Sequence, residues 1–248
     1  GMNYKLKDGY ILAKSKGKLK GTSVKFPKIS VGATENSIIA ACLAQGKTTL
    51  KNCATEPEIK DLTDFLNSAG AKINWNGRTC KIEGVKSLNQ AEYSVMADRI
   101  EAGTFCVAAT LAKGNLQINN LNPKIIKTEL KLLKRTGAKI KIDKNKILIK
   151  GPEKIKSVKS IKTKEFPGIP TDLQAQIMVL MCKADGKSTI TESIFENRFM
   201  HVGELQRLGA IISITNNKAL IEGNTKFVGA ELMSSDLRAS VALVLAAM

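Results

Sequence analysis

Stretches of apolar residues with helical spacing alternate with short runs of β-favouring residues along this chain of 248 residues. In residues 168–209, Thr171-Asp172 precedes an apolar run that ends at Gly186, which predicts a helix with a polar cap. The run KSTITE then predicts a strand. A second helix is predicted from near Arg198 to the end of this stretch, and AIISI predicts a further strand.

The same pattern occurs in residues 30–84 and 97–151. Glycines mark the ends of both helices in each copy: Gly46, Gly114 and Gly186 for the first helix, and Gly70, Gly137 and Gly209 for the second. Corresponding glycines are about 70 residues apart, which predicts a repeated helix–strand–helix–strand–strand unit. A fourth copy begins at SSDLRASVALVLAAM, and Met248 falls inside its first helix. The chain is therefore expected to have an α/β fold built from repeats.

Residues 4–29 lack a preceding helix and resemble the tail of a further repeat. Residues 10–12 and 23–26 are strand-like, and KGKLKG between them predicts the turn of a hairpin. Two domains are expected: residues 1–96 would hold this hairpin and one full repeat, and residues 97–248 two full repeats and the start of a third. Because both ends then cut through a repeat, the chain is expected to be a fragment of a longer protein.

Composition narrows the class of protein. The chain is 43% hydrophobic, enough for a sizeable core, and no apolar run is long enough to span a bilayer. The five cysteines are scattered without metal-binding spacing, so no metal site is expected. Cys42, Cys106 and Cys182 fall on the first helix of their repeats and are interpreted as small core residues. Unpaired cysteines suit a reducing cytoplasm.

The net charge of +17 leaves three interpretations open: a solvated lysine-rich surface, attraction of an anionic small substrate, or binding of nucleic acid. Aromatic residues make up only 4% of the chain, and its lysines are spread along the whole length. Because single-stranded nucleic acids stack on aromatic side chains, this composition makes nucleic acid the least favoured partner.

Several polar residues lie where helices are predicted to begin. The small residues of SVGAT, residues 30–34, would leave backbone N–H groups open to an anion, although the local pattern favours an ordinary Ser or Thr cap with a packing glycine. Glu56 either complements a helix N-terminus or faces a cleft. Asp98, Asp172 and Asp236 each start the first helix of a repeat. They are expected to cap it, and they could together line one cleft as acid, base or ligand-orienting groups.

Two arginines and one histidine complete the candidate chemistry. Arg198 and Arg238 lie just past predicted element boundaries, and a guanidinium suits bidentate contact with phosphate or carboxylate. His201 is the single histidine of the chain. A lone histidine on a helix is interpreted as structural.

Six motifs make the sequence specific: SVGATEN, EPEIKDL, DRIEAGTF, PTDLQAQ, FENRFMHVGELQRLGA and SDLRAS, in this order. Together they resemble the UDP-N-acetylglucosamine 1-carboxyvinyltransferase family, which are enolpyruvyl transferases of bacterial cell-wall synthesis. The resemblance covers nearly the whole chain from Gly9 onward. The sister enolpyruvyl transferases that act on shikimate phosphate share the repeat fold, but their motifs are less similar.

The resemblance implies an inside-out α/β barrel of two similar domains, each of three repeats, with the active site in a cleft that closes on substrate. It implies transfer of an enolpyruvyl group from phosphoenolpyruvate to the 3′-hydroxyl of UDP-N-acetylglucosamine, the first committed step of peptidoglycan synthesis, without a cofactor. Asp172 matches the family residue that contacts the sugar and is the candidate base. Ile194 matches one that contacts the nucleotide sugar through its backbone.

Two further sets of residues match family positions. The residues that match the UDP contacts are Lys28, Ile29, Ser30 and Val31. The residues that match other positions in or behind the cleft are Glu56, Arg99, Arg198, Asp236 and Arg238.

Parts of the family pattern are absent from these 248 residues. The Lys-Asn pair near the N-terminus, the loop PGG-x-AIG-x-RP with its catalytic Cys or Asp, and a late phosphate-binding arginine are not found. Phosphoenolpyruvate would lack its main cationic ligands and its proton donor, so the chain alone is expected to have no transferase activity. Two alternatives stay open: a non-catalytic scaffold that needs a complementing chain and self-associates through unfinished repeats, and a basic nucleic-acid-binding protein.

Overall fold

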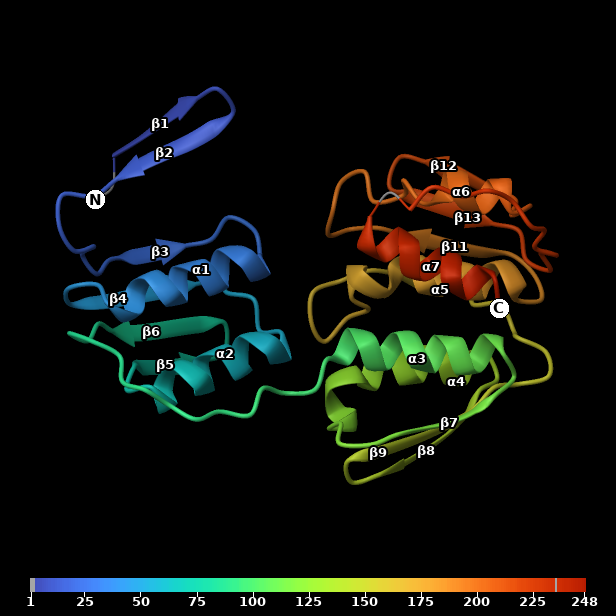
Figure 1. The fold of residues 1–248 in the computed structure, drawn as a ribbon, viewed down its shortest axis with the longest axis horizontal. Helices are drawn as coiled ribbons and strands as arrows, with labels where there is room; N and C mark the ends of the chain where they lie inside the picture. The colour runs from blue at the N-terminus through green and yellow to red at the C-terminus, as the bar shows by residue number, and fades with distance from the viewer. Residues whose placement is uncertain (1–2, 235) are drawn as a thin grey trace. The chain divides into compact units, whose positions relative to one another are not determined.

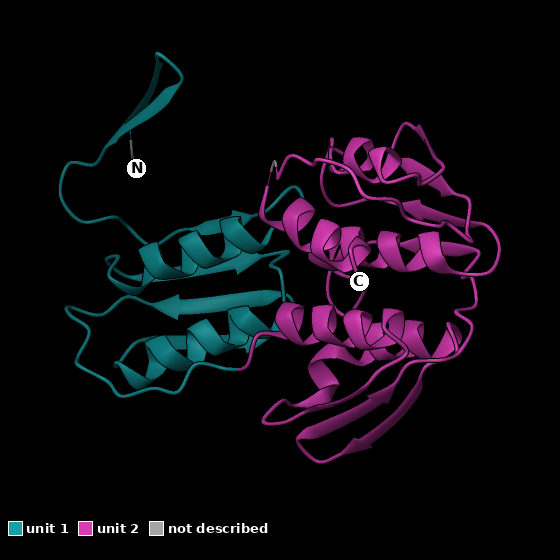
Figure 2. Cartoon of the chain, turned by 45° about the vertical axis from the view of Figure 1, so that its right-hand side comes forward, with its two compact units in different colours: residues 1–96 teal, residues 97–248 magenta. Residues whose placement is uncertain are grey.

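A computed structural model describes residues 3–234 and 236–248, and the chain divides into two compact units, residues 1–96 and 97–248 (Figures 1 and 2). Each unit contains the predicted repeat of a helix, a strand, a second helix and two more strands. Within the described ranges, every helix is too short or too polar to cross a membrane.

Unit 1 holds one complete repeat. Its elements are α1 (Val31–Cys42), β4 (Lys47–Lys51), α2 (Pro57–Ser68), β5 (Lys72–Asn76) and β6 (Thr79–Glu83). A further strand, β3 (Ser23–Lys25), pairs in parallel with β4, and the remaining pairs of the sheet β3-β4-β6-β5 are antiparallel. Ile38 of α1, Leu50 of β4 and Ile82 of β6 belong to the core between helices and sheet.

The hairpin predicted between residues 10–12 and 23–26 is wrong. Instead β1 (Asn3–Lys7) pairs with β2 (Tyr10–Lys14), while β3 joins the four-stranded sheet (Figure 1). Asp8 and Gly9 have φ angles of 52° and 80°, which are the left-handed conformations that a two-residue hairpin turn requires. All residues of β1 and β2 are exposed, so this hairpin contributes no side chain to the core of unit 1.

Unit 2 holds two complete repeats and one more helix. The first repeat comprises α3 (Arg99–Leu111), β7 (Asn115–Ile118), η1 (Pro123–Ile126), α4 (Lys127–Arg135), β8 (Lys139–Asp143) and β9 (Lys146–Lys150). The second comprises β10 (Ser160–Lys162), η2 (Thr171–Leu173), α5 (Gln174–Lys183), β11 (Ser188–Thr191), α6 (Val202–Arg207), β12 (Ile212–Thr215) and β13 (Lys218–Ile221). The helix predicted at the end of the chain is α7 (Leu237–Ala246). The two sheets have the strand orders β7-β9-β8 and β10-β11-β13-β12.

The core of unit 2 is a layer of helices. α5 packs against α3 and α7, and Figure 1 shows these helices beside one another, with the strands on the outside. Of the 10 residues of α5, nine are buried. The helix predicted from near Arg198 begins later, at Val202. Asn197 takes a left-handed φ of 54° and the following residues form turns, which delays the start of α6.

A third set of glycines, which the helix-ending pattern did not mark, closes each repeat after its last strand. A Cβ on Gly84 would lie 1.7 Å from the carbonyl oxygen of Ala44, and one on Gly223 would lie 2.0 Å from that of Ala184. In the middle repeat, a Cβ on Gly151 would lie 2.5 Å from the carbonyl oxygen of Ala109. Only glycine lets the chain pass the end of the first helix at this distance.

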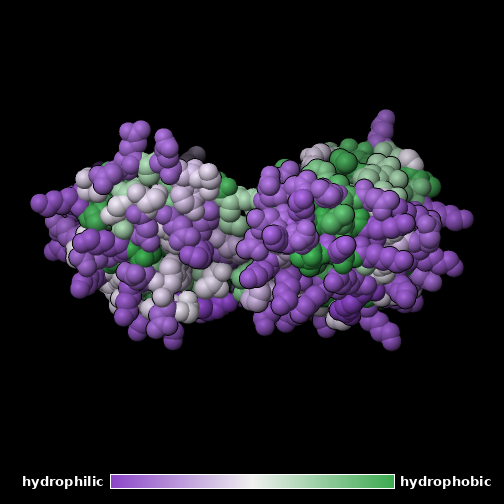
Figure 3. All heavy atoms as spheres, turned by 90° about the horizontal axis from the view of Figure 1, so that it is seen from below, coloured by the Kyte–Doolittle hydropathy of each residue, from purple (hydrophilic) through white to green (hydrophobic). Residues whose placement is uncertain are grey.

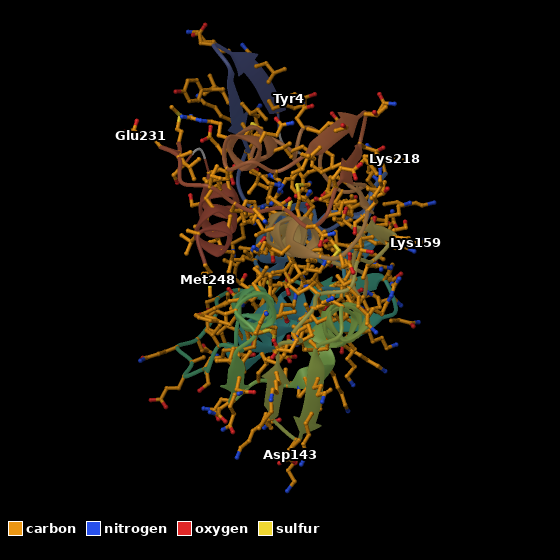
Figure 4. The ribbon with its side chains drawn as sticks, turned by 90° about the vertical axis from the view of Figure 1, so that its right-hand side faces the viewer. Tyr4, Asp143, Lys159, Lys218, Glu231 and Met248 are labelled. Atoms are coloured by element: carbon orange, nitrogen blue, oxygen red, sulfur yellow. The ribbon has the colours of Figure 1, made fainter. Side chains whose placement is uncertain are left out.

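Polar and apolar side chains separate as the composition suggests. Hydrophilic atoms cover most of the face in Figure 3, and Lys159 and Lys218 project from the surface of unit 2 in Figure 4. Cys42, Cys106 and Cys182 are at most 1% exposed, which confirms their interpretation as core residues. Burial raises the pKa of both Cys106 and Cys182 to about 12, so these thiols stay protonated.

Candidate functional site

The start of α1 carries the residues predicted to contact UDP. Ser30 is the N-cap residue of α1, and its hydroxyl accepts a hydrogen bond from the Ala33 amide at 3.2 Å. The Thr34 hydroxyl donates to the Ser30 carbonyl at 2.7 Å and accepts from the Ala54 amide at 3.0 Å. These bonds fix the start of α1 to the segment after β4. Lys28 is exposed, and Ile29, Ser30 and Val31 are partly buried.

This helix start is open on one side. A Cβ built on Gly32, in the first turn of α1, would meet no other atom within 4 Å. The ordinary cap expected for this segment is present at Ser30. The space beside Gly32 remains for a ligand to approach the backbone.

Three glutamates lie near this helix start. Glu56 occupies the N-cap position of α2, where it is buried but makes no side-chain capping bond. Burial and the neighbouring Glu58 and Glu56 carboxylates raise the pKa of Glu35. Caps and motifs in the sequence do not predict the raised pKa of Glu35, because Glu56 and Glu58 belong to a different helix.

Asp172 of unit 2 contacts two arginines from distant parts of the sequence. Arg198 Nη2 lies 3.0 Å from Asp172 Oδ1, and Arg238 Nε donates to the same oxygen. The side chains of Asp172 and Arg198 are 29% and 19% exposed, so this cluster is partly shielded and still reachable from solvent. The Arg198 guanidinium also lies over the Phe195 ring, 4.8 Å from its centroid. The structure thus brings together three of the predicted site residues.

The prediction that Asp172 caps its helix is wrong. Asp98 accepts from the Ile100 amide at 2.7 Å, and Asp236 accepts from the Arg238 amide at 2.9 Å, so both are caps as predicted. Asp172 lies inside η2, which has Pro170 at its N-cap position and no side-chain capping bond. Counted from the helix-ending glycines, Pro170 and not Asp172 corresponds to Asp98. The two-residue offset frees the Asp172 carboxylate for the arginines.

Ile194 follows β11 in the loop that leads to Arg198. Its amide donates to Glu192 Oε1 at 2.8 Å, so the loop is held by a buried carboxylate that the motif comparison did not single out. The sequence signal that could have marked Glu192 is an acidic residue directly after a β-favouring run.

Arg99 lies in the interior of unit 2. It is 5% exposed, its Nη1 is 3.7 Å from Glu129 Oε1, and its guanidinium lies over the Phe166 ring at 5.8 Å. These contacts link α3 to α4 and to the segment before η2. A ligand contact by Arg99 stays a prediction.

The charge of Arg198 contributes to the pKa shifts of both His201 and Asp236. The pKa of His201 is lowered to about 4, mainly by burial; the Asp236 charge opposes this shift and the Arg198 charge adds to it. Hydrogen bonds from the amides of Ala239 and Arg238 lower the pKa of Asp236. At neutral pH His201 is therefore uncharged, which suits the interpretation of a structural histidine.

No group of three or more His, Cys, Asp or Glu side chains is placed to hold a metal ion among residues 3–234 and 236–248. The chemistry that the described residues offer is a carboxylate held by guanidinium groups, next to a loop with fixed backbone.

Solved structures share this fold. The enolpyruvyl transferase NikO from Streptomyces tendae matches with a TM-score of 0.86 at 23% identity, over 99% of this chain and 61% of that chain. An EPSP synthase from Acinetobacter baumannii matches with a TM-score of 0.70 at 19% identity, over 99% of this chain and 61% of that chain. At these identities the likeness concerns the fold, which is that of the enolpyruvyl transferases. The predicted fold class is thereby confirmed.

Sequence comparison defines the family. The model of the EPSP synthase (3-phosphoshikimate 1-carboxyvinyltransferase) family matches residues 1–248. A UDP-N-acetylglucosamine 1-carboxyvinyltransferase of Pelagibacter ubique is 61% identical over 100% of this chain and 60% of its own length. One of Geobacter metallireducens is 48% identical over 99% of this chain and 59% of its length. The chain belongs to the EPSP synthase family, within which it resembles the proteins that carry the UDP-N-acetylglucosamine name, as its motifs predict. It spans about three fifths of the length of these curated relatives.

Proposed function

We propose that this chain carries nucleotide-sugar-binding residues of a UDP-N-acetylglucosamine 1-carboxyvinyltransferase, which transfers an enolpyruvyl group from phosphoenolpyruvate to the sugar 3′-hydroxyl in peptidoglycan synthesis. The names of the curated relatives support this assignment. The structural observation that carries it is the cluster of Asp172, Arg198 and Arg238, which joins three family motifs in one partly exposed place.

In this proposal Asp172 contacts the sugar hydroxyl and serves as its base. Both arginine contacts are to Oδ1, so we assign the hydroxyl to Oδ2. The arginines hold Oδ1 and thereby orient the carboxylate, so that Oδ2 can receive the hydroxyl proton. Ile194 would contact the sugar through its carbonyl oxygen, because its N–H already donates to Glu192.

The start of α1 is assigned to the UDP part of the ligand. The first N–H groups of a helix attract anions, and the space beside Gly32 leaves them approachable. Lys28, three residues before α1, adds an exposed positive charge. The nearby carboxylate of Glu35 works against an anion, so we expect this segment to contact the uridine and to add little affinity for phosphate.

We further propose that residues 1–248 alone do not turn over substrate. The loop motif that supplies the family's catalytic Cys or Asp is absent from these residues. Binding of the nucleotide sugar and enolpyruvyl transfer are then separable: the first is expected of this chain and the second is not.

Calorimetric titration of the chain with UDP-N-acetylglucosamine tests the binding proposal. Asp172→Asn should weaken binding about tenfold or more, the equivalent of one charged hydrogen bond. Asp143→Asn is the matched control, because Asp143 lies at the exposed tip of the β8–β9 hairpin (Figure 4) and should bind like the unmodified chain. Absence of binding at millimolar ligand, or equal affinity of both variants, would contradict the proposal. A phosphate-release assay with both substrates tests the second part, which measurable turnover would overturn.

A further inference from the structure

Glu192 is a buried carboxylate with a complete set of neutral hydrogen-bond donors. It directly follows β11 and is 3% exposed. Its Oε1 accepts from the Thr163 hydroxyl at 2.8 Å and from the amides of Ile194 and Phe195 at 2.8 and 3.1 Å. Its Oε2 accepts from the Thr171 hydroxyl at 2.9 Å. One side chain thus joins the end of β10, the start of η2 and the loop before α6.

The backbone around Glu192 is fixed as well. Its amide donates to the Asn217 carbonyl at 2.8 Å, and the Asn217 side-chain amide donates to the Glu192 carbonyl at 2.9 Å. The Ser193 amide donates to the Thr163 hydroxyl at 2.9 Å. Glu192 therefore has little freedom to move, and neither do the groups that it binds.

Holding a loop with a buried carboxylate has a cost in free energy of folding. Removing a carboxylate from water has a large free-energy cost, which its hydrogen bonds must offset. None of the four donors carries a formal charge, so no ion pair offsets it. A carboxylate does give short and strong bonds to several donors at once, which a neutral side chain of similar size does not. The arrangement thus favours rigidity of the connected segments over stability.

The connected segments are those that carry the candidate sugar contacts. Thr171 immediately precedes Asp172, and the bonded amides belong to Ile194 and Phe195. The Phe195 ring in turn lies under the guanidinium of Arg198, which contacts Asp172. The Asp172 carboxylate is therefore connected to Glu192 by two routes, one through Thr171 and one through Phe195 and Arg198.

We propose that Glu192 is a positioning residue that sets the distance between Asp172 and the backbone of Ile194, and thereby the affinity for the sugar of a nucleotide sugar. The proposal rests on the proposed function of this site. Glu192 acts through Thr171 and the loop amides and touches no ligand. Its effect should therefore appear in affinity for UDP-N-acetylglucosamine and not in affinity for UDP, which lacks the sugar.

Thr171→Val gives the sharpest test, because it removes one hydroxyl and keeps the shape of the side chain. We expect affinity for UDP-N-acetylglucosamine to fall about tenfold, as for one lost hydrogen bond to a charged group, with UDP affinity unchanged. Thr110→Val is the matched control: Thr110 is fully buried in α3, and its hydroxyl donates to the Cys106 carbonyl at 2.8 Å. Thr110→Val should lower the melting temperature about as much as Thr171→Val does. It should leave the affinities for UDP-N-acetylglucosamine and for UDP unchanged.

Glu192 itself is tested by a conservative and a truncating variant. In Glu192→Gln the amide oxygen can keep the donors now on Oε1, and the Thr171 hydroxyl can turn to accept from the amide nitrogen. This variant should bind the nucleotide sugar within about threefold of the unmodified chain, while Glu192→Ala should lose more than about tenfold.

The outcomes separate this proposal from the function on which it rests. If the unmodified chain binds neither UDP-N-acetylglucosamine nor UDP, the proposed function fails and this inference fails with it. If the unmodified chain prefers the sugar nucleotide but Thr171→Val leaves that preference unchanged, Glu192 is a structural residue only and the function stands. Should Glu192→Ala fail to fold, the Thr171→Val result decides.

Discussion

α1 of unit 1 and α5 of unit 2 are corresponding helices of the repeat, yet their surroundings differ. α1 buries four of its 12 residues, whereas α5 buries nine of 10. Counted from the helix-ending glycines, Ile39 corresponds to Val179; Ile39 is 51% exposed and Val179 is 0% exposed. α5 lies against α3 and α7, while α1 packs against α2 and its own sheet within unit 1. An apolar helix pattern therefore shows what can be buried, and the neighbouring helices determine what is buried.

The starts of these two helices differ in the same way. The Ser30 hydroxyl caps α1, so this side chain bonds to its own helix. At the start of α5 the turn η2 places Pro170 at the cap position, and Asp172 turns to Arg198 and Arg238 instead. Because the Asp172 carboxylate does not cap the helix, it is available for a ligand. Loss of one local bond at a helix start is what makes the candidate site of unit 2 possible.

The largest expected effect comes from placing a charge at the two corresponding helix positions. Val179→Asp would bury an unpaired carboxylate among three helices and should cost unit 2 more than about 4 kcal/mol, enough to unfold it. Ile39→Asp should cost unit 1 less than about 1 kcal/mol, because that position is half exposed. Hydrogen exchange measured on peptides from each unit distinguishes the two. Similar protection losses in both variants would show that α1 is covered as fully as α5.

A feature shared by both units should give effects of equal size. Gly84→Ala and Gly223→Ala each drive a Cβ into a helix-end carbonyl, and we expect each to cost about 3 kcal/mol. Gly203→Ala is the control, because a Cβ at this position of α6 meets no atom within 4 Å and alanine favours a helix. Thermal unfolding followed by circular dichroism should show lower melting temperatures for Gly84→Ala and Gly223→Ala and no decrease for Gly203→Ala. A mild effect of Gly84→Ala alone would mean that unit 1 relaxes more easily than unit 2.

The two units should also differ in their response to acid. The folded-state pKa of His201 is lowered to about 4, so the unfolded chain binds the proton first, and unit 2 should lose roughly 3 kcal/mol as pH falls from about 7 to about 4. The lowered pKa of Asp236 adds a further loss below its ordinary value of 3.8. In unit 1 the pKa of Glu35 is raised, so its contribution has the opposite sign: stability falls as pH rises above 4.5.

Separate probes can follow these two responses. The single tryptophan, Trp75, lies in β5 and reports on unit 1, while hydrogen exchange in α5 and α6 reports on unit 2. His201→Gln should flatten the acid dependence of unit 2 and leave that of unit 1 unchanged. An acid response of unit 2 that persists in this variant would assign it to other groups.

Much of this fold follows from local sequence signals, and the exceptions have physical causes. The repeat, the helix-ending glycines and the caps Asp98 and Asp236 are set within a few residues, so pattern and spacing predict them. The N-terminal hairpin could have been predicted as well, because Asp8-Gly9 is a strong signal for a tight turn. The segment KGKLKG is a competing turn signal, and the hairpin predicted around it is the one that does not form.

The candidate site is only partly local. Motifs identify Asp172, Arg198 and Arg238 one by one, but their contact depends on how three segments of unit 2 fold together. Glu192 binds donors from β10, η2 and its own loop, and no spacing in the sequence connects these. Residues that act on their own element leave a local signal in the sequence, whereas residues that act between elements do not.

The smallest expected effect tests the difference between the two helix starts directly. Ser30→Ala removes a capping hydroxyl and should cost unit 1 about 1 kcal/mol. Asp172→Asn removes no cap, so α5 itself should not weaken; its cost should be the loss of ionic attraction to two arginines, less than about 1 kcal/mol because these side chains are partly exposed. Salt separates these causes, because it screens charges and leaves a neutral capping bond nearly unchanged. The difference between Asp172→Asn and the unmodified chain should therefore shrink in about 1 M salt, whereas the difference for Ser30→Ala should persist. If both differences persist in salt, Asp172 holds its helix start much as Ser30 does, and the two helix starts are alike after all.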